Sequence, residues 1–189
     1  MLVGNLIASG SSDKSIKIWE INSGECEKTL ISHTNAVTCI LKFNETHLVS
    51  ASADNTIKIW NFEMAVNIYT LSEHTGIVKC LLKFDDTTLI SGSIDKTIKI
   101  WNLFNYECLS TLTGHESSVN SLALFGDNQI ISGSSDKTVK VFDLKNIKES
   151  RCIKTVSGQH SQLITTVLNL DDKKIISSSY DFLIKVYST

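Results

Sequence analysis

Serine, histidine and aspartate, the residue types of the hydrolytic triad, recur together along this 189-residue chain. A serine beside a histidine that an aspartate orients is the nucleophile of many acyl-transfer enzymes. Here the three types return in the same order, one set per repeat: His33, Ser50 and Asp54; His74, Ser91 and Asp95; His115, Ser132 and Asp136; His160, Ser177 and Asp181. A catalytic site needs one activated nucleophile beside an oxyanion hole, and the chain has no G-x-S-x-G motif. We therefore expect no enzyme and no catalytic residue, and a structural role for these sets.

The residues that could bind a metal or a cofactor show no suitable spacing. Four of the five histidines belong to the sets, and His47 stands alone in residues 44–47. The five cysteines include no C-x-x-C pair, and no glycine-rich loop could cradle a phosphate. We expect no metal, no cofactor, and free thiols that point into separate local cores. Free thiols are typical of an intracellular protein, so we expect the cytoplasm and leave the nucleus open.

The composition predicts a globular chain without a nucleic-acid or membrane partner. Hydrophobic residues make up 42% and charged residues 20%, and the net charge is -2. Such a chain is neither disordered nor drawn to polyanions, and no apolar run approaches the roughly 20 residues that span a bilayer. A lysine recurs in each repeat: Lys17, Lys58, Lys99, Lys140 and Lys185. This stripe could suggest nucleic acid or lipid, but we expect lysines on a solvated strand face, where they discourage edge pairing.

One stretch occurs five times and sets the period of the chain. It reads SGSIDKTIKIW over residues 91–101, and the aspartates of its copies are Asp13, Asp54, Asp95, Asp136 and Asp181. A period of about 40–45 residues indicates a structural array. Within one period we expect four short antiparallel strands, at residues 67–71, 77–84, 88–93 and 97–101, the last alternating as a more exposed strand would. The single domain 1–189 then divides into a partial unit 1–30 and units 31–71, 72–112, 113–156 and 157–189.

These units resemble WD (tryptophan–aspartate) repeats, with a histidine before the innermost strand and S-x-S-x-D-x-T-I-K-I-W across the last two. The chain departs from the family pattern in places: only Gly114-His115 keeps the Gly-His pair, and Asn102 follows Trp101 where aspartate is usual. The resemblance implies an all-β propeller of four-stranded blades around a channel. We expect about four full blades plus one partial blade in an open or incomplete ring, because two strands of a closed five-bladed ring are missing.

An open ring leaves blade edges that invite association. We favour a piece of a longer propeller, of about seven blades by the resemblance. Self-association of two chains through their open blade edges is the alternative.

The resemblance also implies what the repeated polar residues do. In the family the turn aspartate accepts from the histidine, the histidine meets the strand serine, and the serine meets an indole N–H, here of Trp60 or Trp101. Buried polar groups need such partners. Phe142 stands at the indole position of the next unit, so that set should be one bond short and looser. Tyr187 stands at this position in the last unit, and we do not assume that it substitutes.

Members of this family mostly bind proteins on the narrow face of the propeller. The resemblance places three residues of each unit on that face: Ala36, Thr38 and Ala53; Ile77, Lys79 and Ile94; Ser118, Asn120 and Ser135; Leu163, Thr165 and Tyr180. Apolar clusters and tyrosine are enriched at partner sites. We expect a protein or peptide partner with an apolar anchor, with packing of these side chains against neighbouring loops as the alternative.

Three functions are consistent with these residues. The leading interpretation is a non-enzymatic protein-interaction scaffold. The second is a targeting or regulatory portion of a larger enzyme assembly, such as a kinase or a ubiquitin-ligase substrate receptor, whose catalytic part lies outside this chain. The third, a small-molecule or glycan binder in the central channel, is disfavoured because the innermost strands are largely apolar.

Overall fold

The computed structural model describes residues 4–171 and 173–188, and in that part eighteen strands form five separate antiparallel sheets. We name the sheets blades 1 to 5 in chain order. Blade 2 contains β4 (Val37–Lys42), β5 (His47–Ser52), β6 (Ile57–Asn61) and β7 (Val66–Leu71). Blade 3 contains β8 (Val78–Lys83), β9 (Thr88–Ser93), β10 (Ile98–Asn102) and β11 (Glu107–Leu112). Blade 4 contains β12 (Val119–Phe125), β13 (Gln129–Ser134), β14 (Val139–Asp143) and β15 (Arg151–Val156).

The two end blades have three strands each within the described residues. Blade 1 contains β1 (Leu6–Gly10), β2 (Ser15–Glu20) and β3 (Cys26–Ile31). Blade 5 contains β16 (Ile164–Asp171), β17 (Lys174–Ser179) and β18 (Ile184–Ser188). By comparison with blades 2 to 4, the described residues form no innermost strand in blade 1 and no outermost strand in blade 5, which agrees with the expected shortfall of two strands.

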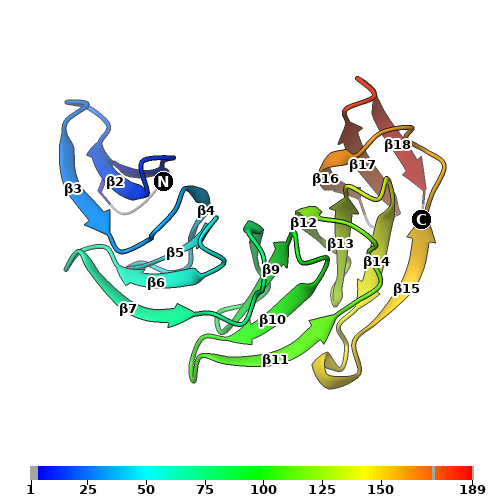
Figure 1. Cartoon of the computed structure of the whole chain (residues 1–189), viewed down its shortest axis with the longest axis horizontal. Helices are drawn as coiled ribbons and strands as arrows, with labels where there is room; N and C mark the ends of the chain where they lie inside the picture. Colours follow the sequence, from blue (N-terminus) through cyan, green and yellow to red (C-terminus); the bar gives the residue numbers. More distant parts are fainter. Residues whose placement is uncertain (1–3, 172, 189) are drawn as a thin grey trace.

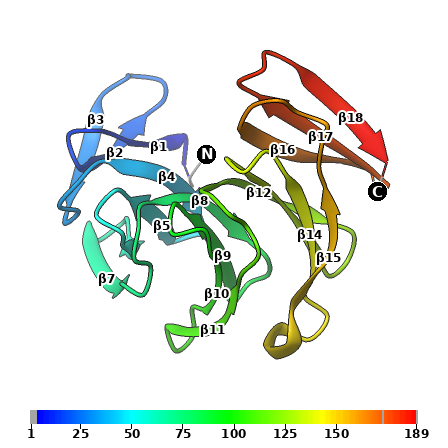
Figure 2. The ribbon, with the colours of Figure 1, turned by 45° about the vertical axis from the view of Figure 1, so that its right-hand side comes forward.

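The blades follow one another along an arc (Figure 1). The first strand of each complete blade lies on the concave side and the last strand lies on the convex side. The two end blades do not meet in this view, and the turned view in Figure 2 shows the same separation. The prediction of an all-β propeller with an open ring is therefore confirmed.

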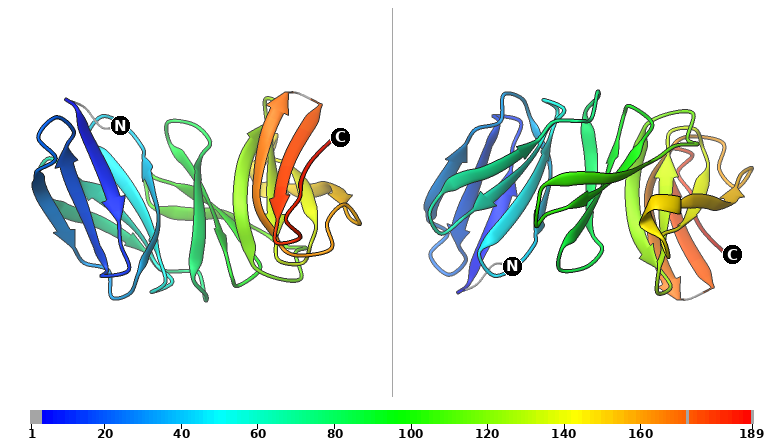
Figure 3. Two further views of the ribbon diagram at one scale, coloured as in Figure 1. Left: turned by 90° about the horizontal axis from the view of Figure 1, so that it is seen from above. Right: turned by 90° about the horizontal axis from the view of Figure 1, so that it is seen from below.

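The hydrophobic core lies between the blades. Figure 3 shows the neighbouring sheets stacked along the arc, and a separate cluster of buried apolar side chains fills each of the four spaces between them. Between blades 2 and 3, for example, Ile57 and Ile59 of β6 pack with Val78 and Leu89 of the next blade. The core is thus built in layers, one for each pair of neighbouring blades.

Since neighbouring blades cover both faces of an internal sheet, alternation along a strand does not indicate exposure. The third strand of blade 3 was predicted to be more exposed, but Ile98, Ile100 and Trp101 of β10 are all buried. This prediction was wrong because the side chain of Lys99, the polar residue between the two isoleucines, is only 12% exposed.

The lysine stripe differs from its prediction for the same reason. Lys58 is buried, and its Nζ donates to Thr70 Oγ1, on the opposite residue of the outermost strand, at 2.9 Å. Lys99 and Lys140 make the same bond, each to a threonine of the next strand, at 2.9 Å. The solvated-face prediction is wrong for Lys58, because a cross-strand hydroxyl satisfies the ammonium and the outermost strand covers its stem.

The cysteines are free thiols, but their predicted position in local cores holds only in part. Cys80 is buried, and Cys39 and Cys108 pack against the core between blades 2 and 3. Cys26 and Cys152 are exposed instead, since both begin or nearly begin an outermost strand on the convex side.

The sequence shows no helical pattern, yet a short 3-10 helix, η1 (Ile147–Glu149), forms between β14 and β15 of blade 4. It begins where the Asn146 side chain accepts from Lys148 N, and it ends at Ser150. No helix within the described residues has the length and the apolar character needed to cross a bilayer.

Candidate functional site

A chain of hydrogen bonds crosses blade 2 from the β5–β6 turn to the indole on β6. His33 Nδ1 lies 2.8 Å from Asp54 Oδ2, and His33 Nε2 lies 2.7 Å from Ser50 Oγ. Trp60 Nε1 donates to the same serine hydroxyl at 2.8 Å. Because the serine oxygen accepts from the indole, the serine hydroxyl donates its own proton in the hydrogen bond to His33 Nε2. The His33 Nδ1–H then donates to the carboxylate of Asp54. This assignment gives every group in the chain a partner.

Blade 3 repeats the arrangement almost atom for atom. His74 lies 2.6 Å from Asp95 Oδ2 and 2.8 Å from Ser91 Oγ, and Trp101 Nε1 donates to Ser91 at 2.8 Å. The imidazole and indole rings meet edge to face, with centroids 6.0 Å apart. The network ties the segment before the innermost strand, which carries His74, to the second and third strands of the blade.

The other blades keep the network only in part. In blade 4, His115 is 2.7 Å from both Asp136 Oδ2 and Ser132 Oγ, although Phe142 supplies no donor. In blade 5, His160 is 2.8 Å from Asp181 Oδ2 and 2.7 Å from Ser177 Oγ. The set in blade 4 is therefore one bond short, but its remaining bonds are both 2.7 Å long, within the 2.6–2.8 Å range of the same bonds in blades 2 and 3.

Tyr187 does not replace the indole. Within the described residues its hydroxyl is buried and makes no hydrogen bond. Burial raises the pKa of this hydroxyl, and the nearby Ser177 lowers it by a smaller amount. In blade 1, Trp19 Nε1 donates to Ser9 Oγ at 2.8 Å, so the indole–serine part of the network is present there as well.

Sequence reasoning missed further donors to the turn aspartates. Thr56, Thr97 and Thr138 each donate their hydroxyl to the aspartate two positions before them at 2.6 Å. The backbone N–H that follows the histidine donates to the other carboxylate oxygen, as Thr34 does to Asp54 at 2.9 Å. The recurrence of threonine in three repeats was a signal that could have identified the first donor.

These contacts set the charge of His33, His74 and Asp54. Burial lowers the pKa of His33 and of His74 and outweighs the bonds to Asp54 and Asp95, which raise it. Burial would raise the pKa of Asp54, but hydrogen bonds from Thr56, Thr34 and His33 hold it well below its usual range. At pH 7 the rings are neutral and the aspartate is ionised.

The same geometry leaves no accessible nucleophile in the sets. Ser50, Ser91, Ser132 and Ser177 are completely buried, so a substrate has no access to their hydroxyls. No group of three His, Cys, Asp or Glu side chains in the described part of the chain could hold a metal ion.

The twelve candidate partner-binding residues lie at one end of the blades. Within each blade, the residue before the aspartate donates its backbone N–H to the residue three places after the histidine: Ala53 to Ala36 at 2.8 Å, Ile94 to Ile77 at 2.9 Å, Ser135 to Ser118 at 2.8 Å and Tyr180 to Leu163 at 3.1 Å. All twelve are at least partly exposed. Tyr180 is 64% exposed and Ile94 is 41% exposed.

Seven of the twelve line one hollow of about 400 Å³: Lys79, Ser118, Asn120, Ser135, Leu163, Thr165 and Tyr180. We call it the candidate-face hollow. Its lining comes from blades 3, 4 and 5, and it combines hydroxyl and amide groups with one ammonium, one leucine and one tyrosine. Ala36, Thr38, Ala53, Ile77 and Ile94 lie outside it.

Two of the candidates also join neighbouring blades. Asn120 Nδ2 in blade 4 donates to the carbonyl of Ile164 in blade 5 at 2.7 Å, and to Ser135 Oγ at 2.9 Å. Thr38 Oγ1 in blade 2 donates to the carbonyl of Val78 in blade 3. At these two positions the side chain stabilises the packing of blades, a role that sequence reasoning did not foresee.

Comparison with known proteins gives a consistent result along the chain. The family model described as "WD domain, G-beta repeat" matches five stretches: 3–20, 24–61, 65–102, 106–143 and 150–188. Each stretch ends at or next to the third strand of a blade.

Individual relatives match more locally. The chain is 41% identical over 44 residues to "Mitochondrial division protein 1" of Malassezia globosa, which covers 23% of this chain and 6% of that protein. It is 58% identical over 31 residues to "Nuclear distribution protein PAC1" of Arthroderma otae, which covers 16% of this chain and 7% of that protein. Among solved structures, the WD40 β-propeller domain of Doa1 matches with a TM-score of 0.83 and 30% identity, over 97% of this chain and 60% of that one.

Proposed function

The chain belongs to the WD40 repeat family, and from this we propose that it is a non-enzymatic scaffold that binds a protein or peptide partner on its candidate face. This fold is typically that of a non-catalytic interaction domain. The observation that carries the proposal is the candidate-face hollow, because seven of the residues that the family resemblance placed on this face line it together.

The chemistry of the hollow supports a peptide with an apolar anchor. Tyr180 presents a largely exposed ring at its edge, and Leu163 is half-buried in its lining. Tyrosine supplies a large contact area at low entropic cost and is enriched at binding hot spots. Around these apolar groups, hydroxyls and the exposed Lys79 offer partners to the peptide backbone and to an acidic group.

A comparison of captured proteins tests the proposal. Wild type, Tyr180→Ala and Leu163→Ser would be used as baits, with thermal unfolding measured to show that each variant is folded. The control is Ile31→Ala, which removes a side chain of similar exposure far from the hollow. We expect partners that wild type and the control capture to be depleted about tenfold with the Tyr180 variant. Identical partner sets for all baits would contradict binding at this face.

The runner-up function is a targeting or regulatory portion of a larger enzyme assembly. The chain spans 6% and 7% of the length of the two relatives above, so repeats of this kind also occur within much larger proteins. In that case the same hollow would bind a partner on which a catalytic part outside this chain acts. This function would be favoured if wild type captured an enzyme complex with measurable activity and the Tyr180→Ala variant did not.

A further inference from the structure

A second hollow lies at the opposite end of the blades, between blades 2 and 3. Its volume is about 310 Å³, and five apolar residues form part of its lining: Phe43, Ile59, Leu103, Phe104 and Tyr106. We call it the rim hollow. Its lining includes residues of the β4–β5, β8–β9 and β10–β11 turns, whereas the candidate face carries the turns at the other ends of these strands. The size is at the lower end of ligand pockets and suits one or two side chains.

The backbone of Tyr106 is strained, and we attribute the presence of a tyrosine at this position to a function of its side chain. Tyr106 has a φ of 61°, in the left-handed region that bulky residues avoid. The equivalent turn position is Gly24 in blade 1 and Ala65 in blade 2, also left-handed. The turn thus requires this conformation, and glycine would meet the requirement without strain. Strained bulky residues are found mainly where the side chain has a function.

Tyr106 is held rigidly in this conformation. Its ring stacks on Tyr69 of β7, with centroids 4.2 Å apart and planes 9° from parallel. The stack bridges blades 2 and 3 and fixes one wall of the rim hollow before any ligand arrives. A preformed aromatic wall reduces the entropic cost of binding.

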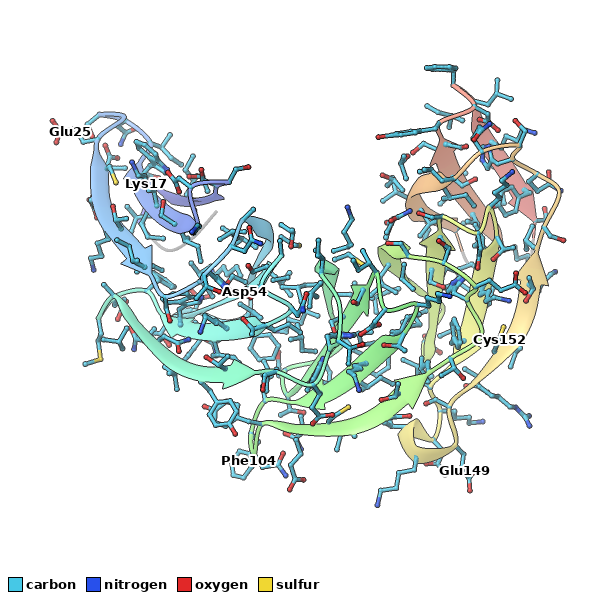
Figure 4. All side chains as sticks on the ribbon, viewed as in Figure 1. Lys17, Glu25, Asp54, Phe104, Glu149 and Cys152 are labelled. Atoms are coloured by element: carbon cyan, nitrogen blue, oxygen red, sulfur yellow. The ribbon has the colours of Figure 1, made fainter. Side chains whose placement is uncertain are left out.

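Phe104 provides an exposed aromatic group next to this wall. Its side chain is 87% exposed, and it projects from the convex margin of the arc beside β10 and β11 (Figure 4). The equivalent positions in blades 1, 2 and 4 are Asn22, Glu63 and Lys145. A phenylalanine that replaces polar residues at this one blade is not required by the fold, and exposed aromatic groups mark interaction sites.

The charges around the rim hollow favour a basic ligand. Asp86 lines the hollow, and its side chain is 97% exposed; Glu45 follows the lining residue Asn44 and is 76% exposed. The lysines that pair with them, Lys83 and Lys42, are only 32% and 31% exposed. Lys83 also donates to the carbonyl of Phe43 and lies over its ring. In both ion pairs the carboxylate is therefore the partner that solvent and a ligand reach more easily, and exposed ion pairs of this kind are weak enough to exchange partners.

From these observations we propose that the rim hollow binds an extended segment of a protein partner in which an aromatic side chain is flanked by lysine or arginine. The aromatic side chain enters between Phe104 and Tyr106, and the flanking cations lie against Asp86 and Glu45. This site is separate from the candidate face, so the chain can hold two partners at once.

Peptide titration followed by amide chemical shifts tests this proposal. The probe is Gly-Ser-Lys-Phe-Lys-Ser-Gly, and the comparison peptides replace its phenylalanine by alanine or both lysines by glutamate. We expect saturable shifts around residues 43–47, 86–87 and 103–106 with the probe only. Tyr106→Gly, which relieves the strain, and Phe104→Ala should weaken its binding at least about tenfold. Glu63→Ala, at the position equivalent to Phe104, is the matched control and should bind the probe as wild type does.

Each alternative outcome overturns the proposal in a definite way. No saturation by about 5 mM probe would show that the hollow does not bind such a segment. Equal binding of the acidic peptide would show that the charge argument is wrong. Equal binding by Phe104→Ala, with unfolding unchanged, would place the peptide elsewhere. Loss of binding in the Tyr180→Ala variant as well would show one site instead of two.

Discussion

His115 Nε2 and Ser132 Oγ lie 2.7 Å apart in blade 4, the same distance as His33 Nε2 and Ser50 Oγ in blade 2. The indole that donates to the serine of blade 2 is absent from blade 4, where Phe142 fills the space and is 1% exposed. The histidine–serine bond therefore does not depend on the indole. A buried aromatic ring occupies this position in both blades.

This difference predicts unequal costs for the same substitution. Ser50→Ala leaves two buried groups without a partner, the indole N–H of Trp60 and Nε2 of His33, whereas Ser132→Ala leaves only Nε2 of His115. We expect Ser50→Ala to lower the free energy of unfolding by about 1–3 kcal/mol more than Ser132→Ala does. Urea unfolding of the two variants measures the difference. Equal losses would show that the indole bond adds nothing to the network.

The neutral, buried histidines predict that stability falls on mild acidification. His33 and His74 have lowered pKa values in the folded chain, because burial disfavours the imidazolium form. Below the unfolded pKa of about 6.5 the unfolded chain binds protons that the folded chain does not, so stability is lost as pH falls. We expect a lower free energy of unfolding at pH 5.5 than at pH 7.5, with a smaller slope in the His33→Gln and His74→Gln double variant. A stability that is constant or rises over this range would contradict the assignment.

How far the sequence predicted this structure depends on the range of the interaction. The order of His33, Ser50 and Asp54 is a local repeat signal, and their hydrogen bonds form within one blade. The pairing of Tyr180 with Leu163 likewise follows from the register of a single sheet. Such features can be read from one repeat at a time.

Features that depend on a neighbouring strand or blade could not be read in this way. Burial of Lys58 depends on Thr70 in the outermost strand, and alternation alone suggested exposure. The strained backbone of Tyr106 and its stack on Tyr69 join two blades through a turn that carries glycine elsewhere. The period shows that blades repeat, but it does not show what one blade presents to the next.

The bonds between blades give a third prediction. The Asn120 side chain donates across the blade boundary to Ile164, whereas the side chain of Lys79, at the same register position in blade 3, is exposed and makes no hydrogen bond or ion pair within the described residues. Asn120→Ala should lower the free energy of unfolding by about 1–3 kcal/mol, and Lys79→Ala should change it by less than about 0.5 kcal/mol. Chemical unfolding of both variants measures these two changes in the free energy of unfolding. A comparable loss for Lys79→Ala would mean that this position has a structural role in every blade.

The edge of blade 5 predicts association of residues 1–189 studied alone. In the described residues β18 pairs only with β17, and Ile184 and Val186 are 75% and 54% exposed. An unpaired apolar edge is a template for another strand, and lysine on such an edge prevents pairing. We expect a mass that rises with concentration in sedimentation experiments and falls to that of a monomer with Ile184→Lys. The control Ile31→Lys, at 77% exposure in blade 1, should associate as wild type does. A monomeric wild type at all concentrations would exclude association through this edge.

The buried hydroxyl of Tyr187 gives a last prediction, with an unusual direction. Most core substitutions destabilise, but this hydroxyl has lost its contacts with water and makes no hydrogen bond in the described part of the chain. Tyr187→Phe keeps the ring, which packs against the core between blades 4 and 5, and removes the unpaired group. We expect the free energy of unfolding to stay constant or to rise by about 1 kcal/mol. Tyr187→Ala is the comparison, because it removes the ring as well and should destabilise. If Tyr187→Phe instead lost stability, the hydroxyl would have to bond Ser177 in solution and so complete the network as the indole does in blade 2.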